Sequence, residues 1–221
     1  MREALAGLPE AGVLDGVGVL DPAGLAIEDV VRRALAESPE AVLVVAAPES
    51  DAVIPGIVKA TGLSAGRVVG VGTVGQTMRF RELIAARCRV AVEEVHAYVA
   101  GKAEGPLVPL WSTAAIGAVP LHQWAVPGHG KLTVRDRTEI FQQVKEAGAP
   151  DPGVAVGVIV EAIRRDRNRI LPVGSLLDGY HGVSGVCLAV PCIVNRSGAE
   201  VPINIGLNPA EEAGLRQAAG L

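Results

Sequence analysis

The stretch AVLVVA at residues 41–46 decides the fold, because an unbroken apolar run of this length is typical of a strand buried on both faces of a parallel sheet. Apolar strands and amphipathic helices alternate on either side of it. The strands are predicted at 16–20, 41–46 and 67–72, and the helices at 26–37, 52–61 and 73–89. This alternation predicts an α/β fold with a parallel sheet and right-handed crossovers.

The second half of the chain predicts an α+β arrangement with an antiparallel sheet. Strand-like runs and turns follow one another there, and Asn195-Arg-Ser-Gly198 is typical of a hairpin turn. The strands are predicted at 95–100, 105–110, 170–177, 185–194 and 201–205, and the helices at 138–147, 154–165 and 209–219. This change of character places a domain boundary near residues 70–74, which divides the chain into residues 1–70 and 71–221.

The composition predicts a folded chain and narrows the classes of function. Hydrophobic residues make up 49% of the 221 residues and charged residues 20%, which is enough apolar material for a core. The net charge of −4, without a basic cluster, argues against nucleic-acid binding. No apolar run reaches the roughly 20 residues of a membrane span, so no membrane partner is expected. Residues 1–20 lack the pattern of a signal peptide.

The three cysteines Cys88, Cys187 and Cys192 are odd in number and lack metal-ligand spacing. We therefore expect reduced thiols and a cytoplasmic location. Cys187 and Cys192 lie five residues apart in a predicted strand, so their side chains are expected on opposite faces of the sheet. No two histidines have metal-ligand spacing beside an acid, and no metal site is predicted.

Short motifs spread along the chain carry a resemblance to one protein family. They are RVVGVGT at 67–73, MRFREL at 78–83, HAYVAG at 96–101, VPLWS at 108–112, RILPV at 169–173, LDG at 177–179 and VCLAVP at 186–191. In this order, over about residues 26–221, they resemble the L-lactate/L-malate dehydrogenase family. The resemblance implies NAD-dependent oxidation of a 2-hydroxy acid. It also implies a dinucleotide-binding domain followed by an α+β substrate domain, in residues 71–221, and assembly into homodimers or homotetramers.

The resemblance also implies a proton relay, and this chain departs from it at both positions. In the family a histidine in a Gly-Glu-His-Gly-Asp type loop accepts the proton of the substrate hydroxyl, and an aspartate orients that histidine. Here the loop reads GKAEG at 101–105, so Ala103 stands at the histidine position, and Gln76 stands at the aspartate position. Because an alanine accepts no proton, the chain is expected to be catalytically degenerate. Lys102 and Glu104 could replace the relay, but charged residues at a hairpin tip are more often solvated.

The cofactor site implied by the resemblance is incomplete in this sequence. We find no G-x-G-x-x-G at the start of the chain, and residues 1–70 are expected to be the remnant of a dinucleotide-binding domain with a partial Rossmann-like sheet. No arginine between Arg2 and Arg32 matches the family's carbonyl-polarising arginine, and Ala47 replaces its asparagine. The family's small polar residue falls at about Pro150. We therefore expect no cofactor for this chain alone.

Arg79 matches the family's carboxylate-binding arginine, and a guanidinium can bind a carboxylate through two parallel hydrogen bonds. Alternatively, Arg79 pairs with a local acid. Arg81 is expected on the surface or in an interface. The four histidines are expected in other roles: His96 as a structural residue, His122 and His129 in exposed loops, and His181 in a turn.

Three functions remain open at this point. The first is a degenerate family member with a binding, regulatory or assembly role, whose ligand would be a small 2-oxo or 2-hydroxy acid held at Arg79. The second is an NAD-dependent lactate or malate oxidoreductase that an additional N-terminal part or a partner chain completes. The third is a partner-binding protein without a small-molecule site.

Overall fold

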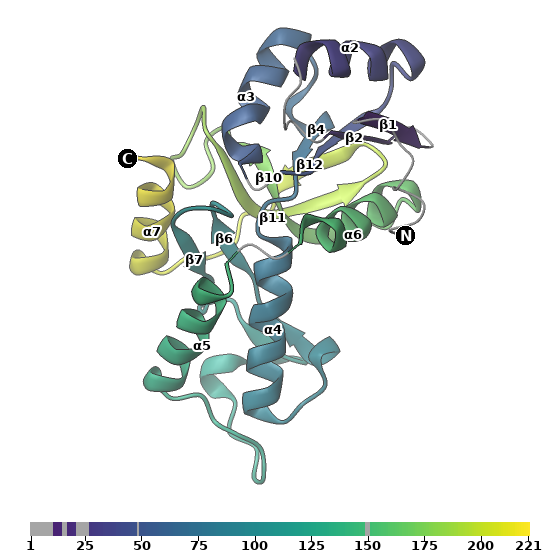
Figure 1. Cartoon of the computed structure of the whole chain (residues 1–221). Coiled ribbons are helices and arrows are strands. Elements are labelled where there is room, and N and C mark those ends of the chain that lie inside the picture. Colours follow the sequence, from purple (N-terminus) through teal and green to yellow (C-terminus); the bar gives the residue numbers. More distant parts are fainter. Residues whose placement is uncertain (1–10, 15–16, 21–26, 48, 149–150) are drawn as a thin grey trace.

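The computed structural model describes residues 11–14, 17–20, 27–47, 49–148 and 151–221 (Figure 1). The strands of its large sheet are β1 (Ala11–Leu14), β2 (Val17–Leu20), β3 (Val42–Val45), β4 (Val68–Gly70), β6 (Val99–Gly101), β7 (Leu107–Pro109), β10 (Arg169–Leu176), β11 (Cys187–Asn195) and β12 (Gly198–Pro202). A small sheet contains β5 (Val95–His96), β8 (Ala115–Ile116) and β9 (Val119–Pro120). The helices are α2 (Ile27–Glu37), α3 (Ser50–Thr61), α4 (Val74–Cys88), α5 (Val134–Glu146), α6 (Pro152–Arg164) and α7 (Pro209–Ala219).

The predicted parallel unit is confirmed. Strand β3 pairs in parallel with β2 on one side and with β4 on the other, and α2 and α3 connect these strands. All four residues of β3 are buried, as the apolar run predicted. Strand β1 was not predicted from the sequence, and it pairs with β2 in the antiparallel direction.

The antiparallel half continues the same sheet. Its strand order is β1-β2-β3-β4-β10-β11-β6-β7, with β12 paired to β11. The junction is the antiparallel pairing of β10 with β4, where Gly174 lies opposite Gly70. The fold is therefore mixed α/β, with a parallel part followed by antiparallel strands. The division into residues 1–70 and 71–221 stays a prediction.

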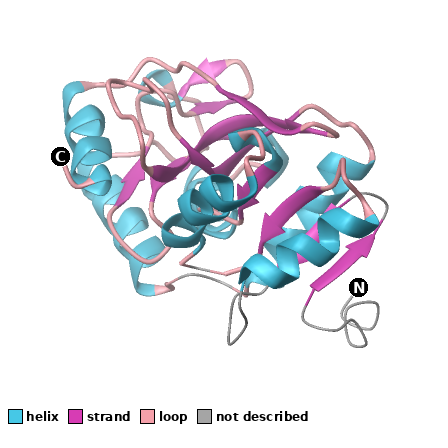
Figure 2. Cartoon of the chain, turned by 90° about the horizontal axis from the view of Figure 1, so that it is seen from above, coloured by secondary structure: helices cyan, strands magenta, loops and turns pink. Residues whose placement is uncertain are grey.

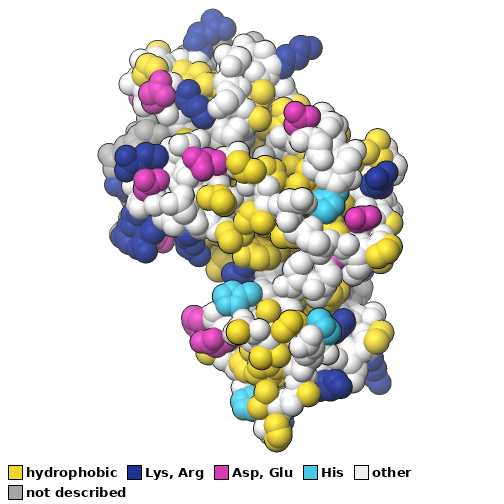
Figure 3. Space-filling view, turned by 180° about the vertical axis from the view of Figure 1, so that it is seen from behind, with side chains coloured by type: hydrophobic (Ala, Val, Ile, Leu, Met, Phe, Trp, Pro, Cys, Tyr) yellow, Lys and Arg dark blue, Asp and Glu magenta, His cyan; other side chains and the backbone are white. Residues whose placement is uncertain are grey.

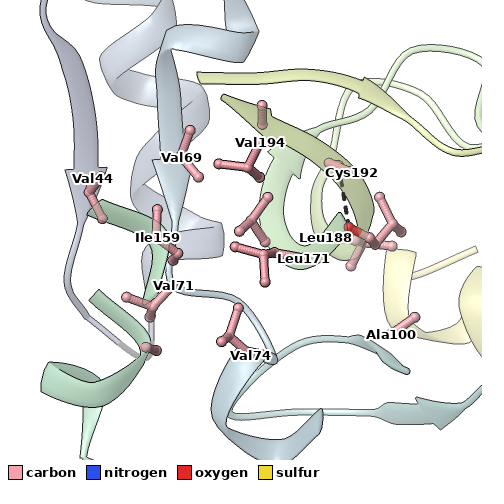
Figure 4. Packing of buried hydrophobic residues seen from close by; sticks show 14 of the residues in the cluster. Val44, Val69, Val71, Val74, Ala100, Ile159, Leu171, Leu188, Cys192 and Val194 are labelled. Atoms are coloured by element: carbon pink, nitrogen blue, oxygen red, sulfur yellow. Dashed lines mark hydrogen bonds between the residues drawn. The ribbon is translucent and has the colours of Figure 1, made fainter. Parts of the chain in front are cut away.

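Helices cover the large sheet on both faces (Figure 2). The main apolar cluster lies between the strands and α6, and it includes Val44, Val69, Ile159 and Leu188 (Figure 4). A second cluster lies beneath α2 and α3 on the other face of the parallel strands. A third cluster fills the lobe that α4, α5 and the small sheet form below the large sheet (Figure 1).

Three predicted elements need correction. The single strand predicted at 95–100 is two strands: β5 joins the small sheet, whereas β6 joins the large one. The helix predicted to start at residue 138 starts at Val134, because Thr133 and Asp136 form a capping box. The strand predicted at 201–205 is β12, which starts at Gly198 directly after the predicted hairpin turn.

The prediction that the side chains of Cys187 and Cys192 lie on opposite faces of the sheet is confirmed. Cys187 belongs to the cluster beneath α3, whereas Cys192 belongs to the main cluster on the opposite face of β11. All three cysteines are free and buried.

Candidate functional site

The turn at residues 102–105 connects β6 to β7 and carries Ala103, which the resemblance described above aligns with the family's histidine. The hairpin closes when the N–H of Lys102 donates to the carbonyl of Pro106 at 3.0 Å. Gly101 has a φ of +107°, and a Cβ there would lie 2.2 Å from the Pro106 carbonyl oxygen, so the turn needs a glycine. Ala103 itself is only 8% exposed. Ala103 is therefore folded onto the protein, whereas Lys102 is half-buried and Glu104 is exposed to solvent as expected for a hairpin tip.

Gln76 lies directly against this turn. Its side chain is 2% exposed on α4, and its Nε2 donates a hydrogen bond of 3.1 Å to the carbonyl oxygen of Ala103. The structure thus brings together the two predicted relay positions. Their contact, however, is between a side-chain amide and the backbone, and the Ala103 methyl offers no group that accepts a proton.

Asp51 is a site residue that the sequence analysis missed. It lies in the first turn of α3, at the carboxyl end of β3, which is the edge where parallel sheets place their ligands. The thiol of Cys187 faces its Oδ1 at 3.8 Å. Lys102 and the Ala103 backbone in the 102–105 turn favour the charged form of its carboxylate. Asp51 therefore lies at the start of α3 next to strand β11.

The surroundings of Asp51 make it a weak acid for an aspartate. Burial raises the pKa of Asp51 from 3.8 to about 6, although Lys102, Cys187 and the Ala103 N–H favour the charged form. An acidic residue in the first turn of the helix that follows an apolar parallel strand was the sequence signal that could have revealed this position.

Arg79 is exposed and pairs with an acid on its own helix. Its side chain is 48% exposed, and its Nη1 lies 3.3 Å from Glu82 Oε2 one turn along α4. This local pair is the alternative that the sequence analysis left open. Two cavities among the described residues have other linings, one between α2 and α3 and one between α4 and α5.

Arg81, which was expected on the surface or in an interface, has a half-buried side chain. Its Nε donates to the Ala97 carbonyl at 2.8 Å, and its guanidinium lies 4.8 Å from the centre of the Tyr98 ring. Burial lowers the pKa of Arg81.

The histidines are found largely where they were expected. His96, His122 and His129 are exposed. His181 lies in a turn with a φ of +47°, and its Nδ1 is 3.8 Å from Glu212 Oε1. The described residues contain no group of His, Cys, Asp and Glu side chains that could hold a metal ion. Within the same residues, no helix is long and apolar enough to cross a membrane.

The connections after β3 and β4 do not fit the pyrophosphate of NAD. Such a turn needs closely spaced glycines, but these connections read AAPE at 46–49 and VGT at 71–73. The one glycine, Gly72, serves the protein's own packing: a Cβ there would lie 2.6 Å from the Pro172 oxygen and from the Gly174 nitrogen. Ala47, at the position of the family's asparagine, is buried. The connection at 21–26 and Pro150 lie outside the described residues.

Comparisons with known proteins agree with this geometry. Residues 73–150 match the family model of the lactate/malate dehydrogenase α/β C-terminal domain. The chain is 40% identical to an L-lactate dehydrogenase of Bifidobacterium animalis subsp. lactis, with 92% of the chain and 68% of that enzyme covered. It is 36% identical to an L-lactate dehydrogenase of Gloeobacter violaceus, with 86% of the chain and 61% of that enzyme covered.

Solved structures give the same result. The minor L-lactate dehydrogenase of Enterococcus mundtii superposes with a TM-score of 0.79 at 27% identity, over 93% of this chain and 73% of that one. The malate dehydrogenase of Salinibacter ruber superposes with a TM-score of 0.78 at 28% identity, over 91% of this chain and 71% of that one. The chain spans about two thirds of the length of the first two relatives. It belongs to the lactate/malate dehydrogenase family.

Proposed function

We propose that this chain has lost the histidine-dependent proton transfer of its family and acts by binding, in a regulatory or assembly role. The observation that carries the proposal is the contact between Gln76 and Ala103. The reaction needs a proton acceptor, and the loss of a general base costs about 10² to 10⁴ in rate. Here the methyl group of Ala103 replaces the base, and the amide that replaces the acid is committed to a backbone carbonyl.

The ligand of this binding role is a small 2-oxo or 2-hydroxy acid whose carboxylate binds Arg79. Half of the Arg79 side chain is exposed, and its partner Glu82 is as exposed as Arg79 itself. Exposed ion pairs of this kind contribute about 0–1 kcal/mol. An incoming carboxylate that accepts two parallel hydrogen bonds can therefore displace Glu82.

The proposal includes no cofactor for this chain alone, since the connections after β3 and β4 do not fit NAD. It includes a cytoplasmic location, which the three free, buried cysteines support. It also includes a homodimer or homotetramer. Self-association is supported by exposed apolar side chains such as Val119, Val126 and Val201 and by the apolar groups on the rear face in Figure 3.

The proposal is tested first by turnover. The purified chain is incubated with NADH and pyruvate or oxaloacetate, and NADH absorbance is followed. We expect no turnover above about 10⁻² of ordinary dehydrogenase rates, given the missing base. Turnover at ordinary rates contradicts the proposal.

Binding is tested separately by the melting temperature in pyruvate, malate or oxaloacetate, since a ligand of the folded state raises it. The Arg79→Ala variant is expected to lose this rise. Arg135→Ala is the matched control, because Arg135 also forms an exposed pair on a helix, with Glu139 at 2.6 Å. An equal rise in all three proteins would remove Arg79 from the proposal.

The second candidate is an NAD-dependent 2-hydroxy-acid oxidoreductase, completed by an additional N-terminal part or a partner chain. The names of the relatives favour it, because each is called an L-lactate dehydrogenase. In-frame sequence upstream that encodes a strand and G-x-G-x-x-G favours this candidate. In such a completed protein, the double change Gln76→Asp with Ala103→His should raise turnover by about 10² to 10⁴ if only the relay is missing.

A further inference from the structure

The connection between β10 and β11 begins with an exposed aspartate that a glycine follows. Asp178 and Gly179 are both exposed, directly after the buried Leu177. Two backbone hydrogen bonds of 2.9 Å close the base of this connection, from the N–H of Leu177 to the Val186 carbonyl and from the N–H of Gly185 to the Leu177 carbonyl. The Asp178-Gly179 pair is therefore open to water while the chain on both sides of it is fixed.

The hydroxyl of Ser184 lies between the two groups of this pair that can react with each other. It accepts a hydrogen bond from the backbone N–H of Gly179 at 2.7 Å, and it donates to Oδ1 of Asp178 at 3.5 Å. One hydroxyl thus holds the backbone nitrogen and the neighbouring carboxyl on the same partner. Because Gly179 has no Cβ, no side chain of its own hinders the approach of its nitrogen to the carboxyl carbon.

We propose that Asp178 is a site of spontaneous backbone modification, at which the aspartyl linkage isomerises to an isoaspartyl linkage through a cyclic imide. The Gly179 nitrogen forms a bond to Cγ of the protonated Asp178 side chain, and the bond between Cγ and Oδ1, which carries the carboxyl proton, breaks. The Gly179 N–H proton passes to the Ser184 hydroxyl, which gives its own proton to Oδ1, so that water leaves.

Water then opens the imide. Attack at Cγ restores aspartate, whereas attack at the main-chain carbonyl carbon of Asp178 gives isoaspartate. The water that enters balances the water that left, and no oxidant, reductant or cofactor takes part. The proposal is independent of turnover and of ligand binding at Arg79.

The modification lengthens the main chain by one methylene group, close to an anchored side chain. Tyr180 lies two residues after Asp178 and belongs to the main apolar cluster, and its hydroxyl donates to the Ile203 carbonyl at 3.1 Å. An inserted methylene shifts this anchor relative to β10. We therefore expect the isoaspartyl form to be less stable than the unmodified chain.

The experiment incubates the full chain at pH 7 in water labelled with heavy oxygen, because each opening of the imide inserts one labelled oxygen atom. After digestion in ordinary water, mass spectrometry reads the tryptic fragment 170–196, in which Asp178 is the only acidic residue. Electron-transfer fragmentation then distinguishes isoaspartate from aspartate. The same measurement in urea gives the rate without the fixed contact to Ser184, and we expect the folded chain to label at least as fast as the unfolded one.

Matched variants assign the effect to the Ser184 hydroxyl. Ser184→Ala should slow labelling of the folded chain about tenfold, less than the loss of a strong general base, because a hydroxyl is a weak acid and a weak base. Ser184→Thr keeps the hydroxyl and should retain the rate, and Ser197→Ala, at an exposed serine of the next turn, should leave it unchanged. Asp178→Ala should remove the label from the fragment.

Two results would overturn the proposal. Slower labelling of the folded wild-type chain than of the unfolded chain would show that the turn protects the Asp178-Gly179 pair. A rate in folded Ser184→Ala that equals or exceeds the wild-type rate would show that the hydroxyl transfers no proton.

Discussion

Asp51 and Asp136 both join a helix to a neighbouring part of the chain, but their surroundings shift their acidity in opposite directions. Asp51 joins α3 to β11, where the Cys187 thiol lies 3.8 Å from its Oδ1, and burial raises its pKa to about 6. Asp136 fastens α5 to α4, where the Thr133 hydroxyl and N–H and the Arg87 guanidinium lower its pKa to about 2. Arg87 Nη2 lies 2.7 Å from Asp136 Oδ1. The contrast teaches that the balance between burial and the donors aimed at a carboxylate decides its charge, more than its place at the start of a helix.

The largest effect is expected when a third carboxylate is introduced at position 76, where its neighbour is the Ala103 carbonyl and not a hydrogen-bond donor. In Gln76→Asp, the Nε2 donor to the Ala103 carbonyl is lost, and a shorter carboxylate is left buried without that partner. We expect a loss of about 3 kcal/mol in the free energy of unfolding at pH 7.5, measured in urea. Gln143→Asp, at an exposed position of α5, is the control and should cost less than about 1 kcal/mol. Equal costs for both variants would show that the Ala103 contact carries no such penalty.

The next prediction concerns the removal of a hydrogen-bond donor from Asp136. Thr133 caps α5, and its hydroxyl is hydrogen-bonded to Asp136 at 2.7 Å. Thr133→Ala should cost about 1 kcal/mol in urea unfolding at pH 7 and raise the pKa of Asp136. A carboxyl whose pKa is lowered in the folded protein stabilises the fold at pH values above its pKa in the unfolded chain, near 3.8. This stabilisation is lost as the pH falls toward 2. In the variant this loss starts at a higher pH.

The matched control is Thr138→Ala, whose hydroxyl donates to the Val134 carbonyl within the helix. That change leaves the partners of Asp136 intact. The loss of stability at low pH in Thr138→Ala should therefore coincide with that of the wild-type chain. A shift of the same size in both variants would refute the role of the cap.

This contrast also marks what the sequence could predict. The capping box of Asp136 lies within four residues, so its signal was available, although the helix was predicted to start at residue 138. The contacts of Asp51 are made over long separations, 136 residues in the case of Cys187. Local periodicity carries no information about such a contact.

The same distinction applies to the fold and to the candidate site. The apolar runs predicted the buried strands β3 and β11, because burial on both faces leaves a continuous pattern. The break between β5 and β6 was missed, since residues 95–100 keep a strand-like pattern while their partners change from one sheet to another. Motif alignment identified Gln76 and Ala103, but their actual hydrogen bond depends on the backbone path of the turn.

The third prediction concerns the removal of the partly buried charge of Asp51. A carboxyl whose pKa is raised in the folded protein contributes a stabilisation that is complete at pH values below its pKa in the unfolded chain, near 3.8. This stabilisation is lost as the pH rises through about 6, the pKa in the folded protein. Asp51→Asn should therefore raise the free energy of unfolding at pH 7.5 by about 1 kcal/mol, after allowance for its partial exposure. The gain should vanish at pH 4. Urea unfolding at both pH values measures it, and a loss of stability at pH 7.5 would mean that the ionised form stabilises the fold.

The smallest effect is expected at Arg79, whose pair with Glu82 is exposed on both sides. Arg79→Gln should change the free energy of unfolding by less than about 0.5 kcal/mol, because water and salt screen such a pair. A large loss, measured in urea at low salt, would assign Arg79 a structural role. Near-neutral stability combined with loss of the melting shift in pyruvate would instead separate binding from folding at this position. Arg79 would then differ from Asp51 and Asp136, because its charge would contribute to ligand binding and very little to the stability of the free protein.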